Sequence, residues 1–187
     1  MCAAARLMQG RLFAVVGPSG AGKDTLIAAA KAARPDLFVA RRVITRPTGA
    51  GGEDFVGVDA ERFAQMQAAG AFALVWRAHG LSYGIPADIL TARAEGRDVV
   101  FNGSRAALPL ALARFADLRV ILVTAPPAVL AQRLAGRGRE TAEDIARRLT
   151  RAGFALPEGI AAIEVQNGGT LAEGVANFLA ALQPPSG

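Results

Sequence analysis

Cysteine, histidine and long apolar runs are scarce in this 187-residue chain, and each scarcity excludes a class of protein. The single cysteine, Cys2, cannot form an internal disulfide, so a disulfide-stabilised secreted fold is excluded and we expect a cytoplasmic protein. No apolar run approaches the roughly 20 residues that span a bilayer, so we expect no membrane partner. The single histidine, His79, leaves little material for general acid–base catalysis.

The net charge of +5 comes from 21 Lys and Arg residues against 16 Asp and Glu residues, and nearly all of the cations are arginines. A basic protein can bind nucleic acid or a membrane surface. The densest basic segment, residues 133–151, also contains acidic residues and has only Phe154 as a nearby aromatic. The planar guanidinium group binds phosphate through paired hydrogen bonds. We therefore expect a small phosphorylated ligand and no nucleic-acid partner, and the sequence leaves the oligomeric state open.

Short apolar segments alternate with helical segments over most of the chain. The apolar segments predict buried strands at 11–16, 38–44, 99–101, 120–123 and 162–165. Caps, prolines and glycines predict helices at 25–33, 59–68, 86–96 and 127–135, and the spacing of N-terminal capping boxes occurs at 141–144 and 170–173. This alternation predicts an α/β fold of three layers, with a parallel central sheet and helices on both faces.

The length suits one compact domain, 1–187, rather than two. Between residues 48 and 96 the alternation gives way to a Gly-rich loop and small elements, which we interpret as an insertion that covers the substrate. We therefore predict a core at about 10–47 and 97–182, and a substrate-binding insertion at about 48–96.

The segment GPSGAGKDT, residues 17–25, follows the first predicted strand and opens the first predicted helix. Gly17, Gly22 and Lys23 match the phosphate-binding pattern G-x-x-x-x-G-K. In such a loop the backbone N–H groups surround phosphate oxygens, and the lysine reaches the β- and γ-phosphates. The sequence therefore predicts ATP as a cofactor, held by the whole loop: Gly17, Pro18, Ser19, Gly20, Ala21, Gly22, Lys23, Asp24 and Thr25.

The residue after the lysine is unusual, because Asp24 stands where the pattern has Ser or Thr, whose hydroxyl ligates Mg²⁺. Three interpretations are open: Asp24 caps the following helix, repels the triphosphate and disables the site, or binds Mg²⁺ directly or through water. The otherwise complete loop argues against disabling, and capping alone leaves a carboxylate facing the triphosphate without compensation. We favour a Mg²⁺ site at Asp24, with Thr25 as a lesser, supporting hydroxyl.

Further motifs resemble those of guanylate kinase in order and spacing over about 11–182: GPSGAGK, ITRP at 44–47, HGLSYG at 79–84, RLAGRGRE at 133–140 and IARRL at 145–149. GPSGAGKD with its aspartate, FALVWRAHGLSYGIP at 72–86 and NGSRA at 102–106 are similar to the ribose 1,5-bisphosphate phosphokinase family. The resemblance implies a guanylate-kinase-like P-loop kinase. It also implies a phosphotransferase that makes phosphoribosyl pyrophosphate from ATP and ribose 1,5-bisphosphate in phosphonate metabolism.

The chain departs from guanylate kinase where that family binds its acceptor nucleotide. The clamp of that family resembles T-R-P-P-R followed by a tyrosine, and here Gly49 and Phe55 stand at the second arginine and at the tyrosine. The segments that correspond to the guanine-binding carboxylates, 72–76 and 100–106, contain no carboxylate. Without these acceptors the buried donors of guanine stay unpaired, at about 1–3 kcal/mol each. The residues therefore argue against GMP as the acceptor.

Six side chains suit the phosphate and hydroxyl groups of a phosphorylated sugar, and each has a structural role as its alternative: Arg46, His79, Tyr83, Asn102, Ser104 and Arg105. Trp76 is expected in the core. By resemblance, Arg137 and Arg148 belong to a lid at about 133–148 that closes over ATP, and together with Lys23 they form the catalytic set. Asn167 resembles the turn that frames the adenine base, with a plain turn residue as the alternative.

Two other functions are weighed against this sugar-phosphate kinase. One is a guanylate kinase-type nucleoside monophosphate kinase, which the substituted clamp and the missing carboxylates disfavour. The other is a non-catalytic guanylate-kinase-like interaction module, which the retained loop glycines and Lys23 disfavour. An acceptor phosphate is already ionised, so a kinase of this kind needs no strong general base, in agreement with the single histidine.

Overall fold

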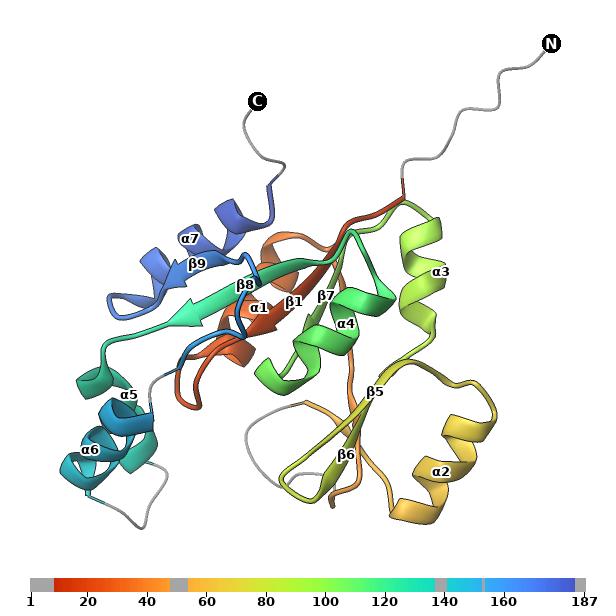
Figure 1. The fold of residues 1–187 in the computed structure, drawn as a ribbon. Helices are drawn as coiled ribbons and strands as arrows, with labels where there is room; N and C mark the ends of the chain where they lie inside the picture. Colours follow the sequence, from red (N-terminus) through yellow and green to blue (C-terminus); the bar gives the residue numbers. More distant parts are fainter. Residues whose placement is uncertain (1–8, 48–53, 137–140, 153, 184–187) are drawn as a thin grey trace.

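The computed structural model describes residues 9–47, 54–136, 141–152 and 154–183, and its centre is a five-stranded sheet (Figure 1). The strands lie in the order β2-β7-β1-β8-β9, and every pairing between them is parallel. Their bounds are β1 (Leu12–Val16), β2 (Phe38–Ala40), β7 (Val99–Asn102), β8 (Arg119–Thr124) and β9 (Ile163–Gln166). The parallel α/β sheet expected from the alternating sequence pattern is confirmed.

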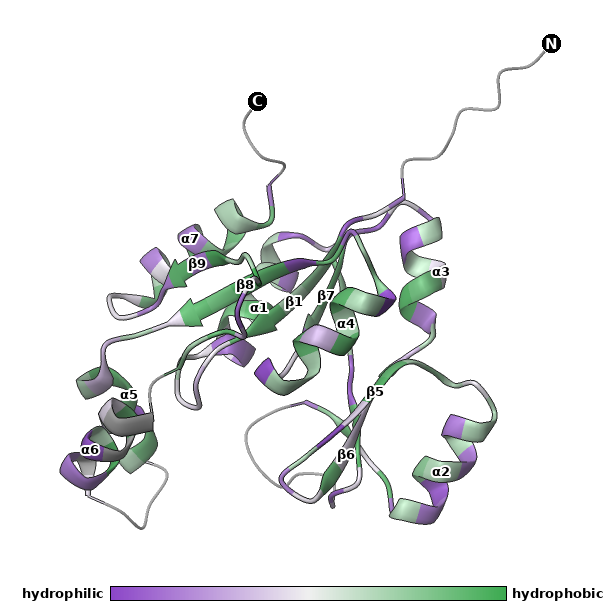
Figure 2. Ribbon diagram, in the orientation of Figure 1, coloured by the Kyte–Doolittle hydropathy of each residue, from purple (hydrophilic) through white to green (hydrophobic). Residues whose placement is uncertain are grey.

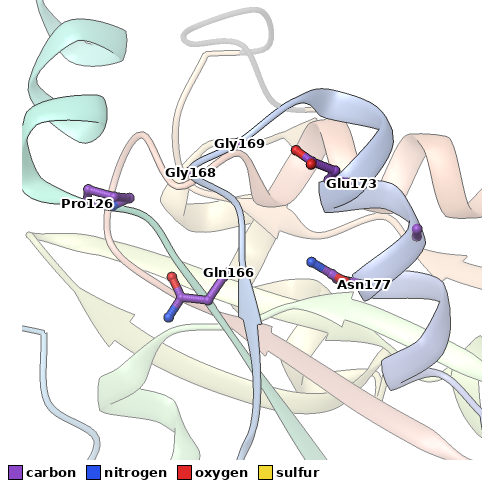
Figure 3. A pocket seen from close by; sticks show the side chains of 7 residues that line it. Pro126, Gln166, Gly168, Gly169, Glu173 and Asn177 are labelled. Atoms are coloured by element: carbon purple, nitrogen blue, oxygen red, sulfur yellow. The ribbon is translucent and has the colours of Figure 1, made fainter.

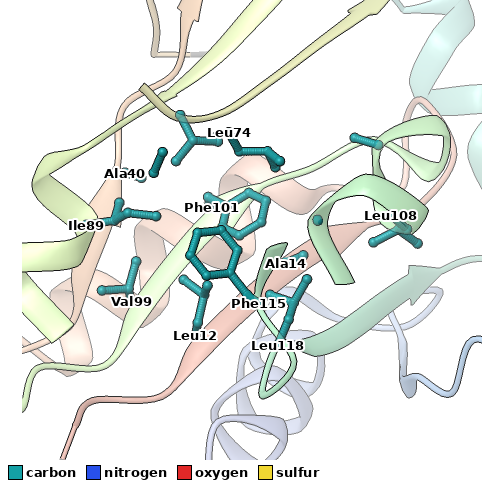
Figure 4. Close-up of a cluster of buried hydrophobic side chains, with 14 of the residues drawn as sticks. Leu12, Ala14, Ala40, Leu74, Ile89, Val99, Phe101, Leu108, Phe115 and Leu118 are labelled. Carbon is teal, nitrogen blue, oxygen red and sulfur yellow. The ribbon is translucent and has the colours of Figure 1, made fainter. Parts of the chain in front are cut away.

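Strand β1 is buried on both faces, and its side chains enter two separate hydrophobic clusters in alternation. Leu12 and Ala14 point into the cluster that α3 and α4 cover (Figure 4). Phe13 points into the cluster that α1 and α7 cover on the opposite face. The bounds of these helices are α1 (Lys23–Ala33), α3 (Asp88–Ala94), α4 (Leu108–Arg114) and α7 (Leu171–Ala181). Figure 2 shows β1 and β7 as mainly hydrophobic, as strands between two helical layers must be.

A second sheet of four strands, in the order β4-β3-β6-β5, is built from residues between β2 and α3. Strands β5 and β6 form an antiparallel hairpin, and α2 packs on it through the stacked rings of Phe63 and Phe72, whose centroids are 4.8 Å apart. Asp59 caps α2 as expected, since its side chain accepts a hydrogen bond from the backbone N–H of Arg62. The bounds are β3 (Val43–Ile44), β4 (Val56–Gly57), α2 (Ala60–Ala68), β5 (Phe72–Ala78) and β6 (Leu81–Pro86).

The single strand predicted at 38–44 is wrong, because β2 ends at Ala40 and β3 belongs to the second sheet. The chain changes sheets at Arg41 and Arg42, and the guanidinium of Arg42 is buried with its carbon 5.5 Å from the centroid of the Tyr83 ring. A continuous apolar run predicts burial, but it does not specify which strand it pairs with.

The helix predicted from Pro86 begins only at Asp88, because Pro86 is the last residue of β6 and pairs with Phe72. Proline fits an edge or terminal strand position as well as a helix start, so the sequence pattern is ambiguous at this residue. The pattern also missed α4 and the 3₁₀ turn η1 (Arg105–Ala107) that precedes it.

Two further helices, α5 (Pro127–Ala135) and α6 (Ala142–Ala152), pack against each other beyond the carboxyl end of β8 (Figure 1). Helix α5 starts at Pro127 as predicted. Thr141 precedes α6, and its hydroxyl accepts a hydrogen bond from the backbone N–H of Asp144 at 3.2 Å. Within the described parts of the chain, no helix combines the length and the apolarity that crossing a membrane requires.

Candidate functional site

The phosphate-binding loop connects β1 to α1 and has a backbone path that requires glycine at its two ends. Gly22 is the N-cap of α1 and has a left-handed backbone, with φ of 89°. A Cβ atom at Gly22 would lie 2.5 Å from the side-chain nitrogen of Asn167, and one at Gly17 would lie 2.2 Å from the carbonyl oxygen of Val123. The glycines therefore allow the loop to lie directly against the ends of β8 and β9.

Lys23 folds back over this loop. Its Nζ donates hydrogen bonds to the carbonyl oxygens of Gly17, at 2.9 Å, and Pro18, at 3.1 Å. The ammonium group thus lies against the first two residues of the loop, while the backbone of Lys23 begins α1. A cation at a glycine-rich loop that leads into a helix N-terminus has the chemistry that suits phosphate groups.

Asp24 and Thr25 lie in the first turn of α1, and both side chains are exposed. Helix α1 has no side-chain cap, since its N-cap is Gly22, but Asp24 lies in its first turn, where a carboxylate interacts favourably with the helix dipole. The carboxylate of Asp24 also accepts a hydrogen bond from Nδ2 of Asn102 at 2.6 Å. An oriented, exposed carboxylate beside a phosphate site has the chemistry that Mg²⁺ prefers.

A protein-only metal cage is absent from the described residues, where no three His, Cys, Asp or Glu side chains converge. Mg²⁺ is commonly held by one or two carboxylates together with substrate phosphates and water. Asp24 therefore fits a metal that is bound jointly with a nucleotide.

Asn167 connects three parts of the site. It follows β9, is buried, and donates from Nδ2 to the carbonyl oxygen of Ala21 at 2.7 Å. On its other side, a Cβ atom at Gly174 of α7 would lie 2.3 Å from its Oδ1. Asn167 thus holds the phosphate loop, the end of β9 and the start of α7 in a fixed relation.

A pocket of about 480 Å³ lies next to Asn167 at the end of β9 (Figure 3). Its lining combines a proline, two glycines and exposed polar side chains: Pro126, Gln166, Gly168, Gly169, Glu173, Ala176 and Asn177. Glu173 is fixed there by the capping box of α7, whose other member is Thr170. The two hydrogen bonds from the backbone and the hydroxyl of Thr170 lower the pKa of Glu173 below its ordinary value.

Arg133 of α5 is a loop contact that the sequence analysis did not select. Its guanidinium reaches the carbonyl oxygens of Gly20 and Ala21, each at 3.4 Å. Arg133 is the first residue of the RLAGRGRE motif, in which only the later Arg137 was predicted to contact ATP. Arg133 brings the α5–α6 pair to the phosphate loop.

Among the residues predicted to bind the acceptor, Arg46 lies two residues after β3, with its guanidinium carbon 4.3 Å from the centroid of the Phe55 ring. Its Nε is buried and has no hydrogen-bond partner among the described residues. Thr45 fixes this segment, because it exchanges two hydrogen bonds with the backbone of Ser82, one through its backbone N–H and one through its Oγ1. A cation oriented by an aromatic ring, with an unused donor, suits an anionic ligand.

Tyr83 and Trp76 stack on neighbouring strands with ring centroids 5.2 Å apart. Trp76 is buried in the hydrophobic cluster of α3 and α4, as expected, and its Nε1 has no partner among the described residues. Tyr83 is half-buried between Trp76 and the guanidinium of Arg42. His79 is exposed at the tip of the β5–β6 hairpin, away from this stack.

Asn102 is the last residue of β7 and contacts Asp24 after the phosphate loop, and Ser104 follows as the N-cap of η1. Arg105 follows in the sequence, and its side chain contacts the segment after α6. Its guanidinium carbon is 4.8 Å from the centroid of the Phe154 ring, and its NH1 donates to the carbonyl oxygen of Ala155 at 3.2 Å. In this conformation Arg105 connects η1 to the segment after α6.

The structure does not describe the side chains of the predicted lid pair. Arg137 lies outside the described residues, and Arg148 belongs to α6 with a side chain that the structure does not describe. Gly49, at the substituted clamp position, also lies outside the described residues. The catalytic assignment of the two arginines stays a prediction.

Comparisons with known proteins identify the family, although no family model matches the chain. A ribose 1,5-bisphosphate phosphokinase PhnN from Ruegeria sp. is 51% identical over 94% of this chain and 93% of its own length. The PhnN of Rhizobium etli is 48% identical over 93% of this chain and 90% of its own. A bifunctional ribose 1,5-bisphosphokinase-thymidine phosphorylase from Cupriavidus necator is 48% identical, and the chain spans only 29% of that longer relative.

A guanylate kinase from Anaplasma phagocytophilum has the same fold, with a TM-score of 0.67 over 94% of this chain and 85% of the other at 16% identity. This likeness agrees with the α/β fold described above. The family assignment rests on the relatives from Ruegeria and Rhizobium etli, which are about half identical to this chain over nearly the full length of both proteins. The chain belongs to the ribose 1,5-bisphosphate phosphokinase family.

Proposed function

We propose that this protein transfers the γ-phosphoryl group of ATP to ribose 1,5-bisphosphate, which yields phosphoribosyl pyrophosphate and ADP. The single observation that carries the proposal is the 51% identity to a ribose 1,5-bisphosphate phosphokinase over nearly the full length of both chains. The geometry supports it, because Lys23 contacts a loop that keeps the glycines and the lysine of the phosphate-binding pattern. An unused donor of Arg46 adds a second candidate anion-binding group just after β3 of the second sheet.

The donor nucleotide would bind along the carboxyl ends of β1, β8 and β9. Lys23 and the N–H groups of the loop hold the β- and γ-phosphates, and the pocket beside Asn167 receives the adenine base. Asp24 would hold Mg²⁺, which when bound neutralises charge on the β- and γ-phosphates. Arg137 and Arg148 are proposed to close over the phosphoryl group during transfer.

The acceptor would bind between the loop and the second sheet. Arg46 is proposed to bind an acceptor phosphate. The further proposed acceptor contacts are His79, Tyr83, Asn102, Ser104 and Arg105. An ionised phosphate oxygen of the acceptor attacks the γ-phosphorus, and the bond to the β-phosphate oxygen of ATP breaks as ADP leaves. No proton needs to be removed, so positioning and charge neutralisation suffice.

A direct product assay tests the proposal. Purified protein is incubated with ATP and Mg²⁺, and with ribose 1,5-bisphosphate or GMP in parallel, while ADP and the phosphorylated products are measured. Phosphoribosyl pyrophosphate with little GDP is the expected result. GDP as the main product would show that the pocket accepts guanine despite its missing carboxylates. ADP without either product would refute this acceptor while retaining the ATP site.

A further inference from the structure

Asp24 and Asn102 form a pair that joins two neighbouring elements at the phosphate loop. Asp24 lies in the first turn of α1, and Asn102 is the last residue of β7, opposite Val15 of β1 in the sheet. Nδ2 of Asn102 donates to Oδ1 of Asp24 at 2.6 Å. Because a carboxylate can only accept hydrogen bonds, the amide must turn its NH₂ group toward Asp24.

The other end of the same amide has no partner. Asn102 is only 8% exposed, and its Oδ1 is buried without a hydrogen bond to any part of the chain that the structure describes. Buried polar side-chain atoms nearly always have a partner in folded proteins. An unpaired acceptor at the mouth of a phosphate site indicates that a bound ligand supplies the missing donor.

The usual P-loop arrangement places these two chemical groups the other way round. There, the loop carries a Ser or Thr hydroxyl and a neighbouring segment carries the aspartate, and together they hold Mg²⁺. Here the loop carries the carboxylate and β7 carries a neutral amide. Both arrangements place one negative charge and one neutral hydrogen-bonding group at the metal site.

We propose that Asp24 and Asn102 replace this pair with the two groups exchanged, so that the carboxylate is on the loop and the neutral group is on β7. This inference rests on the proposed use of ATP with Mg²⁺. Asp24 supplies the carboxylate, and Asn102 is a positioning residue that orients it and leaves Oδ1 to accept a hydrogen bond from the bound complex. The exchange explains why a loop that lacks its usual hydroxyl still has every other feature of an ATP site.

The test measures binding rather than turnover. The dissociation constant of an ATP analogue that cannot transfer its γ-phosphoryl group is determined with and without Mg²⁺, and the ratio of the two constants is the magnesium enhancement. Asp24→Thr should lower this enhancement about 10-fold or more, and Asn102→Ala should lower it about 10-fold, as losses around metal ligands typically do. A residue with a purely structural role would change both constants together and leave the ratio alone.

The deciding variant is the double substitution Asp24→Thr with Asn102→Asp, which rebuilds the usual arrangement. It should restore the enhancement to within about threefold of the wild-type ratio, well above Asp24→Thr alone. Asp88→Thr is the matched control, because it removes an exposed first-turn carboxylate from α3 and should leave the ratio unchanged.

A double variant no better than Asp24→Thr would overturn the exchange, and an unchanged ratio in Asn102→Ala would overturn the positioning role. Melting temperatures monitor folding, and if Asn102→Ala does not fold, the double variant still decides. Wild-type protein that binds no nucleotide under either condition would instead refute the proposed function itself.

Discussion

Lys23 and Lys31 lie at opposite ends of α1, and they are the only lysines of the chain. The ammonium of Lys23 reaches back over the phosphate loop, whereas that of Lys31 donates to the carbonyl oxygens of Pro35 and Leu37 at the far end. Both side chains make backbone hydrogen bonds at their own end of the helix. Only one of them is close enough to contact a phosphate on the loop.

Lys23→Ala should lower kcat by about 100-fold or more, because a preorganised charge at the transferred group is lost. The melting temperature should change little, since the two loop carbonyl oxygens can be hydrated. Steady-state kinetics with thermal unfolding measure both quantities, and Lys31→Ala is the control that should keep its kcat. Near-normal turnover of Lys23→Ala would exclude the ammonium from the transition state.

Arg46→Ala should raise the KM for the phosphorylated acceptor about 10- to 100-fold, which corresponds to one or two charge-assisted hydrogen bonds. The KM for ATP should stay the same, because Arg46 follows β3 of the second sheet, whereas the phosphate loop follows β1 of the first. Arg41→Ala is the matched control, since its exposed ion pair with Asp54 contributes little. An equal rise in both KM values would contradict a specific acceptor role.

At the scale of elements, the site is formed where β1, β7, β8 and β9 end on the same edge of the sheet. Parallel strands bring their carboxyl ends together, and ligands bind there because the connecting loops open at that edge. The elements are fixed to one another by side chains with long sequence separation, such as Asn167 with Ala21 and Asn102 with Asp24. These contacts connect the phosphate loop and the first turn of α1 to the ends of β9 and β7.

Gly174→Ala should disturb this arrangement although alanine favours a helix. The new Cβ atom would lie 2.3 Å from Oδ1 of Asn167 and 3.3 Å from a methyl group of Leu26, so the amide must move and release Ala21. We expect a lower melting temperature and a higher KM for ATP. Helix propensity alone would have the opposite effect on stability, since replacing glycine with alanine in a helix adds roughly 1 kcal/mol to the free energy of unfolding. Thermal unfolding and nucleotide titration measure the two effects.

A double-mutant cycle separates the steric cause from other causes. If Gly174→Ala acts by displacing Asn167, then adding it to Asn167→Ala should cost little more than Asn167→Ala alone. Additive losses in the double variant would show that Gly174 matters for another reason.

At the scale of the whole molecule, the edge of the sheet opposite the site is held by an ionic network. Asp98, just before β7, accepts hydrogen bonds from the backbone and side chain of Arg11 and from Arg34. Burial by itself would raise the pKa of Asp98, but these hydrogen bonds outweigh it and hold the pKa below its ordinary value. The network joins β1, β7 and the end of α1.

A carboxyl group whose pKa is lower in the folded protein stabilises the fold above its unfolded pKa of about 4, and this contribution is lost as the pH falls through the folded pKa. At pH values below about 4, the melting temperature of the wild-type protein should therefore decrease. The Asp98→Asn variant should be less stable than the wild type at neutral pH, and its melting temperature should depend less on pH in the acid range. Melting curves across pH 3 to 7 measure this, with the exposed Asp88→Asn as a control. An unchanged acid slope in Asp98→Asn would contradict the assignment.

Short sequence patterns predicted the phosphate loop, several helix starts and the parallel sheet. The strand, glycine loop and helix that hold Lys23 follow one another within about 23 residues, and the capping box of Thr170 spans four, so neighbouring residues alone specify them. The alternation of apolar strands and helices likewise predicted the parallel sheet. The metal interpretation of Asp24 came from the same local reading and awaits its test.

The tertiary structure decided which distant residues meet. Asn102 lies 78 residues from Asp24, and Asn167 lies 146 residues from Ala21, so no periodicity in the sequence links either pair. The strand predicted at 38–44 was divided between two sheets, and Arg105 contacts Phe154, which lies far from it in the sequence. Apolar patterns report how deeply a segment is buried, whereas strand pairing and side-chain partners depend on which elements pack together, and only the folded chain specifies that.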